Sequence, residues 1–343
     1  MKVEGDHIRA AEDFRRKADL EPIEAEALRS LGREMPESNL RQAAIPVGAR
    51  KLDNKHGSAP GVFIEDERGR FVVMLPGVPR ELRGMTEDTL LPLLRERGLA
   101  AGGECIKSLT LRTTGVAESL LADKLSAAGS RLSAPGVSLA YLPGIDGVDL
   151  RMTVHAKDVS SANASLAKIA DALREAVGES IYGENDADLA AVLLDICRTK
   201  KLKIAVAESC TGGMLGARLT AIPGSSDVFV GGVIAYADVV KLRELDVSER
   251  DIEKHGAVSE EVVRAMAIGA RKKFGVDVAL AITGVAGPGG GTPEKPVGLV
   301  WICAAVGDRV EPRKIQSWGD RQEIRHRAAQ AAMELTRRLL TTG

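Results

Sequence analysis

Three short segments of this chain combine glycines with hydroxyl side chains, a pattern that can bind an anion or the oxyanion of a reacting carbonyl group. Residues 208–213 read ESCTGG, residues 284–292 read GVAGPGGGT, and residues 223–226 read PGSS. Glycines let the backbone approach a ligand closely, and the first turn of a helix presents unpaired N–H groups. Tyr236 and Lys241 stand five residues apart beyond the third segment. These residues are therefore the first candidates for a binding or catalytic site.

Each of these features also has a purely structural explanation. Ser209 or Thr211 can serve only as a helix N-cap, and PGSS on its own is typical of a turn. Lysine is usually solvated, Tyr236 can be a packing residue at a strand end, and the glycine-rich loop can be a surface connection. In an open α/β sheet, however, ligands bind where the loops beyond the carboxyl ends of the strands converge. We expect all three segments to converge at one such edge, and this convergence favours a functional site.

The elements that must position these segments alternate between helix and strand. Residues 186–200 place apolar side chains at helical spacing and are followed at once by a buried strand, residues 202–208. Further strands are predicted at residues 228–236, 276–283 and 297–305, and further helices near residues 239–245, at 259–274 and from about residue 321. This pattern predicts an α/β fold with a sheet covered by helices on both faces.

Two further units precede this one in the sequence. Residues 1–98 begin with a helical pattern and continue through a loop to a strand at residues 71–76 and a helix that starts after Pro79. Residues 104–182 contain predicted strands at 105–113, 137–143 and 149–156 and predicted helices at 115–125 and 160–177. That mixture predicts a small α+β module.

The composition narrows the class of protein. A chain of 343 residues suggests about two or three folding units, and it has no apolar run near the roughly 20 residues that a membrane helix requires. The net charge of −1, with 47 basic and 48 acidic residues, gives no global positive field for a nucleic-acid backbone. The four cysteines lie far apart without a CxxC pair, and the charged start of the chain has no signal-peptide h-region. We therefore expect a cytoplasmic protein without a membrane or nucleic-acid role.

The motifs of residues 184–343, taken in order, resemble the carboxy-terminal domain of the competence/damage-inducible CinA family. They are AESCTGG, IPGSS, the spacing from Tyr236 to Lys241, HGAVSEE, ITGVAGPGGGTPEKPVGLVW and GDRQEIR. Earlier, NKHGSAPG and LPGVPRELRGM resemble the later half of the family's amino-terminal molybdopterin-binding-like domain, and the middle module resembles its KH-like connecting domain. The resemblance implies a partial molybdopterin-binding-like α/β domain at 1–98, a KH-like α+β domain at 104–182 and an α/β/α sandwich at 184–343.

Stand-alone relatives of that carboxy-terminal domain are nicotinamide mononucleotide deamidases of pyridine nucleotide recycling, so the resemblance implies a Ser/Lys amidohydrolase. By motif position, Ser226 is the nucleophile, Lys241 is its base, and Tyr236 and Ser209 support them by hydrogen bonds. Lysine acts as a base near neutral pH only if desolvation or a nearby cation lowers its pKa from about 10.4. This role therefore predicts that Lys241 is substantially buried.

The resemblance also implies the remaining contacts. The substrate-binding positions that it marks are Thr211, Gly212, Gly213, Thr283, Gly284, Gly287, Arg321 and Arg325. Backbone N–H groups of the glycine-rich loops are expected to bind the oxyanion. Arg321 or Arg325 is expected to bind the phosphate, because the planar guanidinium binds phosphate oxygens in pairs. No metal or cofactor is expected for the deamidase, and the expected partners are a small-molecule nucleotide and a second copy in a homodimer.

The chain departs from the family at one place, and alternatives stay open. Family members usually carry a Gly-Gly-Leu-Gly-Pro-Thr loop and an Asp-Asp pair in the amino-terminal domain, and this sequence has neither. We therefore expect no robust ADP-ribose pyrophosphatase activity, and a divalent metal only if that domain were completed.

Cys210, near a predicted helix start, is an alternative nucleophile, and His255 is expected to be structural. A non-catalytic nucleotide-binding or scaffold protein of the competence or DNA-damage response is the other main alternative. RNA binding is disfavoured, because the middle module has no GXXG loop with basic surroundings.

Overall fold

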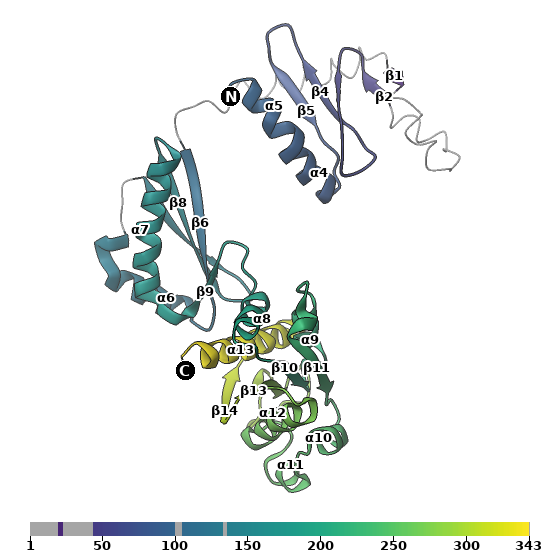
Figure 1. Ribbon diagram of the computed structural model, residues 1–343, viewed down its shortest axis with the longest axis vertical. Coiled ribbons are helices and arrows are strands. Elements are labelled where there is room, and N and C mark those ends of the chain that lie inside the picture. The colour runs from purple at the N-terminus through teal and green to yellow at the C-terminus, as the bar shows by residue number, and fades with distance from the viewer. Residues whose placement is uncertain (1–19, 23–43, 100–104, 133–135, 343) are drawn as a thin grey trace. The chain divides into compact units, whose positions relative to one another are not determined.

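The computed structural model describes residues 20–22, 44–99, 105–132 and 136–342. The chain forms two compact units, Met1–Gly102 and Gly103–Gly343, and each is described by itself (Figure 1). Within the described residues, no helix has both the length and the apolar character needed to cross a membrane.

The described residues of the first unit form two small antiparallel sheets and one helical stretch. β1 (Leu20–Pro22) pairs with β2 (Ala44–Pro46), while β3 (Arg50–Leu52), β4 (Gly61–Glu65) and β5 (Phe71–Met74) form a three-stranded sheet in that order. The helical stretch comprises α4 (Pro79–Met85), the π-helical turn η2 (Thr86–Leu90) and α5 (Leu91–Glu96). The hydrophobic core between the three-stranded sheet and the helical stretch is formed by Leu52, Phe63, Met85 and Leu93. The predicted strand and the helix start at Pro79 are confirmed, whereas the helical pattern predicted at the beginning of the chain lies outside the described residues.

The second unit begins with an α+β module. Its antiparallel sheet has the order β7-β8-β6-β9, formed by β6 (Cys105–Thr113), β7 (Val137–Pro143), β8 (Val148–Ala156) and β9 (Ile181–Glu184). The helices are α6 (Glu118–Ala128) and α7 (Val159–Val177), followed by the short turns η3 (Gly129–Leu132) and η4 (Gly178–Ser180), respectively. Alternate residues of β8 point inward against the apolar face of α7, so the sheet is covered on one side. The predicted α+β pattern is confirmed here.

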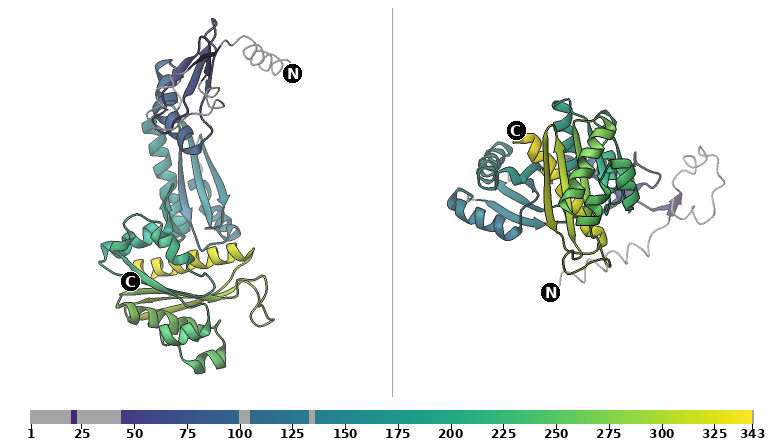
Figure 2. Two further views of the ribbon diagram at one scale, coloured as in Figure 1. Left: turned by 90° about the vertical axis from the view of Figure 1, so that its right-hand side faces the viewer. Right: turned by 90° about the horizontal axis from the view of Figure 1, so that it is seen from below.

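The rest of the second unit is a five-stranded mixed sheet between two layers of helices. The strands β10 (Ile204–Glu208), β11 (Phe229–Ile234), β12 (Val278–Gly284), β13 (Leu299–Val306) and β14 (Arg309–Gln316) lie in the order β11-β10-β12-β13-β14. The first three strands of this order are parallel, and β13 and β14 are antiparallel to their neighbours. One face is covered by α8 (Leu189–Thr199), α9 (Met214–Thr220) and α13 (Arg321–Thr341), and the other by α10 (Asp238–Leu245), α11 (Glu249–His255) and α12 (Glu260–Phe274) (Figure 2).

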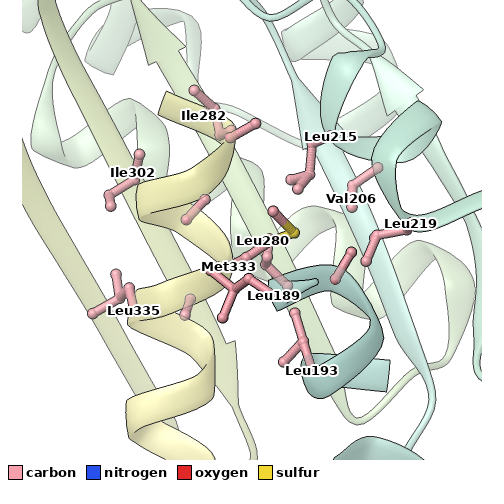
Figure 3. Packing of buried hydrophobic residues seen from close by; sticks show 14 of the residues in the cluster. Leu189, Leu193, Val206, Leu215, Leu219, Leu280, Ile282, Ile302, Met333 and Leu335 are labelled. Carbon is pink, nitrogen blue, oxygen red and sulfur yellow. The ribbon is translucent and has the colours of Figure 1, made fainter. Parts of the chain in front are cut away.

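The central strands explain why this sheet forms a core. Every residue of β10 is buried, and β12 is buried up to its last residue, as expected for strands that are covered on both faces. Leu280 and Ile282 of β12 meet Leu193 of α8 and Met333 of α13 in one cluster (Figure 3). The predicted α/β class, with helices on both faces of a sheet, is confirmed.

In the second unit, three elements were not predicted from the sequence: β9, α11 and β14. In the first unit, β1 to β4 were not predicted, and β3 and β4 overlap the segment expected to be a loop. The strand β14 reads RVEPRKIQ, so its charges and its proline resemble a loop. Natural sheets often place charges and proline on an edge strand, because these residues prevent pairing with another chain. Its pairing with β13 becomes visible in the three-dimensional structure alone.

Candidate active site

The parallel strands bring several chain segments together at one edge of the sheet. Glu208 at the end of β10 is level with Ile234 of β11 and Ile282 of β12. The amide of Ser209 donates to the carbonyl of Ile282 at 2.9 Å, and the amide of Ala235 donates to the carbonyl of Glu208 at 2.7 Å. We call this place, where β10, β11 and β12 end, the carboxyl edge. It is the position where open α/β sheets bind ligands.

A buried carboxylate organises the turn that follows β10. Glu208 is 1% exposed, and its two oxygens accept hydrogen bonds from the amides of Gly213 (3.1 Å), Leu215 (3.0 Å) and Gly216 (2.8 Å). The turn before α9 needs glycine, because Gly212 and Gly213 have φ values of 57° and 95°. The expectation that this helix start offers unpaired N–H groups to an anion is wrong for these three amides, since Glu208 already occupies them.

We predict that Glu208→Gln destabilises the protein by about 2 kcal/mol, because hydrogen bonds to a charged acceptor are worth about 1.5–3 kcal/mol each. The substitution keeps the shape but turns an NH2 group toward backbone N–H donors. Urea unfolding measures the effect, with Glu311→Gln on the exposed side of β14 as the matched control. Equal stability of the two variants would contradict the prediction.

The turn also contains a buried hydroxyl without a partner. Thr211 is fully buried, and its Oγ1 has no hydrogen-bond partner within the described part of the chain. An unpaired buried hydroxyl costs about 1–3 kcal/mol, so such a group is usually satisfied by water or by a ligand. Ser209 is buried beside it, two residues earlier. Thr211 is therefore the clearest sign of a ligand contact at the carboxyl edge.

Two arginines from the start of α13 hold the loops of this edge together. Arg321 donates to the carbonyl of Gly287 (2.6 Å) and to the hydroxyl of Tyr236 (2.8 Å). Arg325 donates to the carbonyl of Thr211 through two nitrogens, at 3.1 and 2.6 Å. Arg325 therefore fixes the turn after β10, whereas Arg321 is exposed and joins the loop after β12 to the end of β11.

Lys241 and Tyr236 also lie at the carboxyl edge. Lys241 is 1% exposed, so its predicted burial is confirmed. Its Nζ donates to a carboxylate oxygen of Asp238 at 3.0 Å and to the carbonyl of Tyr236 at 3.4 Å. Burying an ammonium is costly unless it is paired, and Asp238 provides that pairing. To act as a base, Nζ must first lose a proton, because an ammonium has three donors and no acceptor.

Ser226 lies at the opposite edge. It belongs to the 3-10 turn η5 (Ser225–Asp227), which precedes β11. Asp227 pairs with Arg198, at the end of α8, at 2.6 Å, and its carbonyl accepts from Lys203, just before β10. At about 3.3 Å per residue, the six residues of β11 separate the two edges by roughly 17–20 Å. The expectation that the PGSS segment converges with the other loops is therefore wrong, and within one chain Ser226 is remote from Lys241.

Two of the other expected substrate contacts have structural roles. Thr283 is 1% exposed, and its hydroxyl donates to the carbonyl of Ala257 at 2.8 Å, so it is already engaged within the protein. A Cβ on Gly284 would lie 2.8 Å from the carbonyl oxygen of Leu299, so glycine is needed there for strand pairing. Gly287 does lie at the carboxyl edge, through its carbonyl contact with Arg321.

The alternative cysteine nucleophile does not fit the geometry. Burial raises the pKa of the Cys210 thiol to about 12, so the thiol stays protonated at neutral pH. The expectation that a nearby helix start favours the thiolate is therefore wrong, because desolvation outweighs that effect. Burial likewise raises the pKa of Cys197 and Cys303 to about 12.

We predict that iodoacetamide at pH 8 labels the folded protein at Cys105 alone. Of the four free cysteines, Cys105 is partly exposed and the other three are buried. The pKa values of the three buried thiols lie far above 8, so these thiols stay protonated and unreactive. Intact mass before and after labelling gives the count, and labelling in urea is the control in which every cysteine reacts. Modification of Cys210 in the folded state would contradict the prediction.

Other parts of the second unit add no chemistry to this edge. Hollows of about 510 and 540 Å³ lie elsewhere, one beside the ends of α8 and α13 and one between β6 and α7. In the described part of the chain, no three His, Cys, Asp or Glu side chains gather closely enough to hold a metal ion. His255 contacts Glu261 at 3.3 Å, and its carbonyl accepts from Lys295.

The family models and the relatives similar in sequence point to the same family. Residues 186–340 match the family model described as the CinA C-terminal domain, and residues 108–183 match that of the damage-inducible protein CinA KH domain. A CinA-like protein of Gemmatimonas aurantiaca is 54% identical over 316 residues, which cover 92% of this chain and 73% of that protein. A putative competence-damage inducible protein of Moorella thermoacetica is 42% identical over 308 residues, covering 90% and 73%. The crystal structure of the competence/damage inducible protein CihA from Agrobacterium tumefaciens aligns with 43% of this chain and 90% of its own, at 37% identity and a TM-score of 0.42. This chain therefore belongs to the CinA family of competence/damage-inducible proteins.

Proposed function

We propose that this protein is a nicotinamide-nucleotide amidase, which hydrolyses nicotinamide mononucleotide to nicotinate mononucleotide and ammonia. The observation that carries the proposal is the carboxyl edge, where a buried lysine, an unpartnered buried hydroxyl and an exposed arginine lie around the same loops. Amide hydrolysis needs a base, hydrogen-bond donors for the oxyanion and a means to hold the substrate. The burial of Lys241, the unpartnered hydroxyl of Thr211 and the exposed guanidinium of Arg321 support the proposal, because they are the residue types that these tasks require.

The reaction balances without a metal or a cofactor. A serine hydroxyl attacks the carboxamide carbon while its proton passes to the neutral amine of Lys241, which becomes an ammonium, and the carbonyl oxygen becomes an oxyanion. Lys241 returns the proton to the leaving nitrogen, so that ammonia departs and an acyl ester with the serine remains. Water then attacks this ester while Lys241 takes a proton from the water and passes it to the leaving serine oxygen. The nicotinate nucleotide is released, and the serine hydroxyl and the neutral lysine are restored.

The two arginines have different parts in this proposal. Arg325 uses two nitrogens to hold the carbonyl of Thr211, so we assign it to positioning the turn. Arg321 is exposed, and the Tyr236 hydroxyl orients its guanidinium at the same edge. It is therefore the better candidate for the phosphate, which a guanidinium binds with two parallel hydrogen bonds.

The test is ammonia release from nicotinamide mononucleotide by the purified full chain, with nicotinate mononucleotide identified by chromatography. Nicotinamide riboside, which lacks the phosphate, is the matched substrate control and should react far more slowly. A folded protein that binds the nucleotide tightly but releases no ammonia would rule out the amidase. That result would favour the alternative of a non-catalytic nucleotide-binding or scaffold protein.

A further inference from the structure

We propose that the open edge of β6 and the hollow beside α7 form a docking groove for an extended peptide segment of a partner protein. In that segment, an apolar residue is followed two positions later by an acidic residue. The groove lies within the α+β module and uses none of the residues assigned to the amidase, so it is tested independently of that function. The observations behind it are an unpaired stretch of strand, an adjoining hollow and a positively charged rim.

Residues 105–109 of β6 are paired with a strand on one side alone. The sheet order is β7-β8-β6-β9, and β9 pairs with Leu111–Thr113 of β6. Asn185 extends this pairing by one residue, since its amide donates to the carbonyl of Thr110 at 2.7 Å and its side-chain oxygen accepts from the amide of Thr110 at 3.3 Å. Its φ of 52° then turns the chain away, a conformation that asparagine tolerates. In the described part of the chain, no strand continues along residues 105–109 on this side.

Two backbone positions of this stretch face the open side. The backbone groups of an antiparallel strand alternate between its two neighbours, and those of Thr110 face Asn185, away from β8. The N–H and C=O groups of Ser108 and Ile106, two and four residues earlier, therefore face the same way. Such unpaired groups are the template on which an extended peptide adds as a further strand.

The hollow beside this edge gives the side chains of an added strand room. It has a volume of about 540 Å³ and lies between β6 and α7. Its apolar lining is formed by Leu109 of the strand and by Leu166, Ala167 and Ala170 of the helix. The two alanines are short, so the space next to the strand stays open. Directly paired residues of neighbouring strands point to the same face, so an apolar side chain opposite Leu109 enters this hollow.

The charges of the groove favour an acidic residue in the partner. The charged side chains that line the hollow are Lys107 and Arg174, and no carboxylate lines it. Arg174 is already paired with Asp171 and Glu184. The Nζ atom of Lys107 donates instead to the neutral amide oxygen of Asn163, at 2.9 Å. An acidic side chain opposite Lys107 would therefore gain a cross-strand ion pair.

The order of the two specified residues follows from strand direction. The strand β9 is antiparallel to β6, and antiparallel pairing is slightly more stable per residue than parallel pairing. In that direction, the residue opposite Leu109 comes two positions before the residue opposite Lys107. The apolar residue is therefore first and the acidic residue second. The residue between them exchanges hydrogen bonds with Ser108, so it cannot be proline.

The test is selection from a phage-displayed library of random heptapeptides on the full-length protein, in parallel with its Ala167→Phe variant. Ala167 is exposed and lines the hollow, so phenylalanine fills the groove without entering the core. We expect the selected peptides to share the apolar and acidic residues at this spacing and to bind the variant at least about 10-fold more weakly. Absence of a shared pattern, or equal binding to both proteins, would overturn the inference.

Two further variants control this selection. Ala164→Phe, at another exposed alanine of α7 that does not line the hollow, should select the same peptides as the unmodified protein. Lys107→Glu should select a basic residue where the unmodified protein selects an acidic one, because the cross-strand charge is reversed. Continued selection of acidic residues by Lys107→Glu would contradict the proposed contact. Circular dichroism confirms that each variant is folded.

Hydrogen exchange locates the bound peptide, with the synthetic heptapeptide TTVTETT as the probe. The amides of Ile106 and Ser108 should exchange rapidly in the free protein and at least about 10-fold more slowly with the peptide. The amide of Leu109 faces β8 and should be protected in both states. Protection of Ile106 and Ser108 without peptide would show that this chain or a second copy already covers the edge, and would overturn the inference. Protection by an oligouridine but not by the peptide would assign the groove to nucleic acid and overturn it equally.

Discussion

Replacing Lys241 by methionine is expected to lower kcat for ammonia release by about 10³-fold while the protein stays folded. General acid–base catalysis contributes about 10²–10⁴-fold, and methionine cannot accept or return a proton. Methionine fills nearly the same volume, and Asp238, half-exposed, stays hydrated when its partner is removed. The measurement is steady-state kinetics with circular dichroism and thermal unfolding of the same samples.

The matched control for this prediction is Lys272→Met. Lys272 also pairs with an aspartate, Asp246, at 2.9 Å, but its side chain is 76% exposed and lies on α12. We expect it to keep the activity of the unmodified protein. If Lys241→Met retained a tenth or more of the activity, the lysine would not be the base, and the buried ammonium would have a structural role alone.

Replacing Glu334 by alanine is expected to destabilise the protein by about 3–5 kcal/mol, which is typical when one partner of a buried ion pair is removed. The Glu334 side chain is 3% exposed, and its oxygens accept from Arg337 at 2.7 and 2.9 Å and from Arg338 at 2.6 Å. Arg337 is itself 8% exposed and also donates to the carbonyl of Glu179. Without Glu334, the buried guanidinium of Arg337 would lose its carboxylate partner and keep the contact with the carbonyl of Glu179.

Urea or thermal unfolding measures this loss, and Glu260→Ala is the control. Glu260 pairs with Arg264 on α12 at 3.0 Å, but both side chains are more than 40% exposed, and such surface pairs contribute about 0–1 kcal/mol. We expect a much smaller change for this variant. Equal effects of the two substitutions would show that burial does not set the strength of the Glu334 cluster.

Most helices and strands of the second unit were predictable because they follow from local patterns. The strand β12 and the helices α12 and α13 lie within a few residues of their predicted bounds, since apolar spacing and capping residues are properties of neighbouring positions. The strand β14 was missed because its charges and its proline resemble a loop, and nothing local specifies its pairing with β13.

The candidate site was predictable in part. The segment after β10 and the segment after β12 do meet, because parallel neighbours end at one edge. The PGSS segment precedes β11, so strand polarity places it at the opposite edge, a signal that the order of the residues already contained. The role of Glu208 was missed, although a lone acid at the end of an apolar strand and before two glycines is a sign of a buried cap.

The sequence by itself determined the α/β class, the alternation of elements and the residue types available for hydrolysis, because each depends on periodicity or on chemistry that a residue carries with it. The tertiary structure decided which of these residues meet. It buries Lys241 against Asp238 and leaves the Thr211 hydroxyl without a partner in the described part of the chain. These relations depend on strand order and direction, which arise when distant segments pack into one core and which no local pattern specifies.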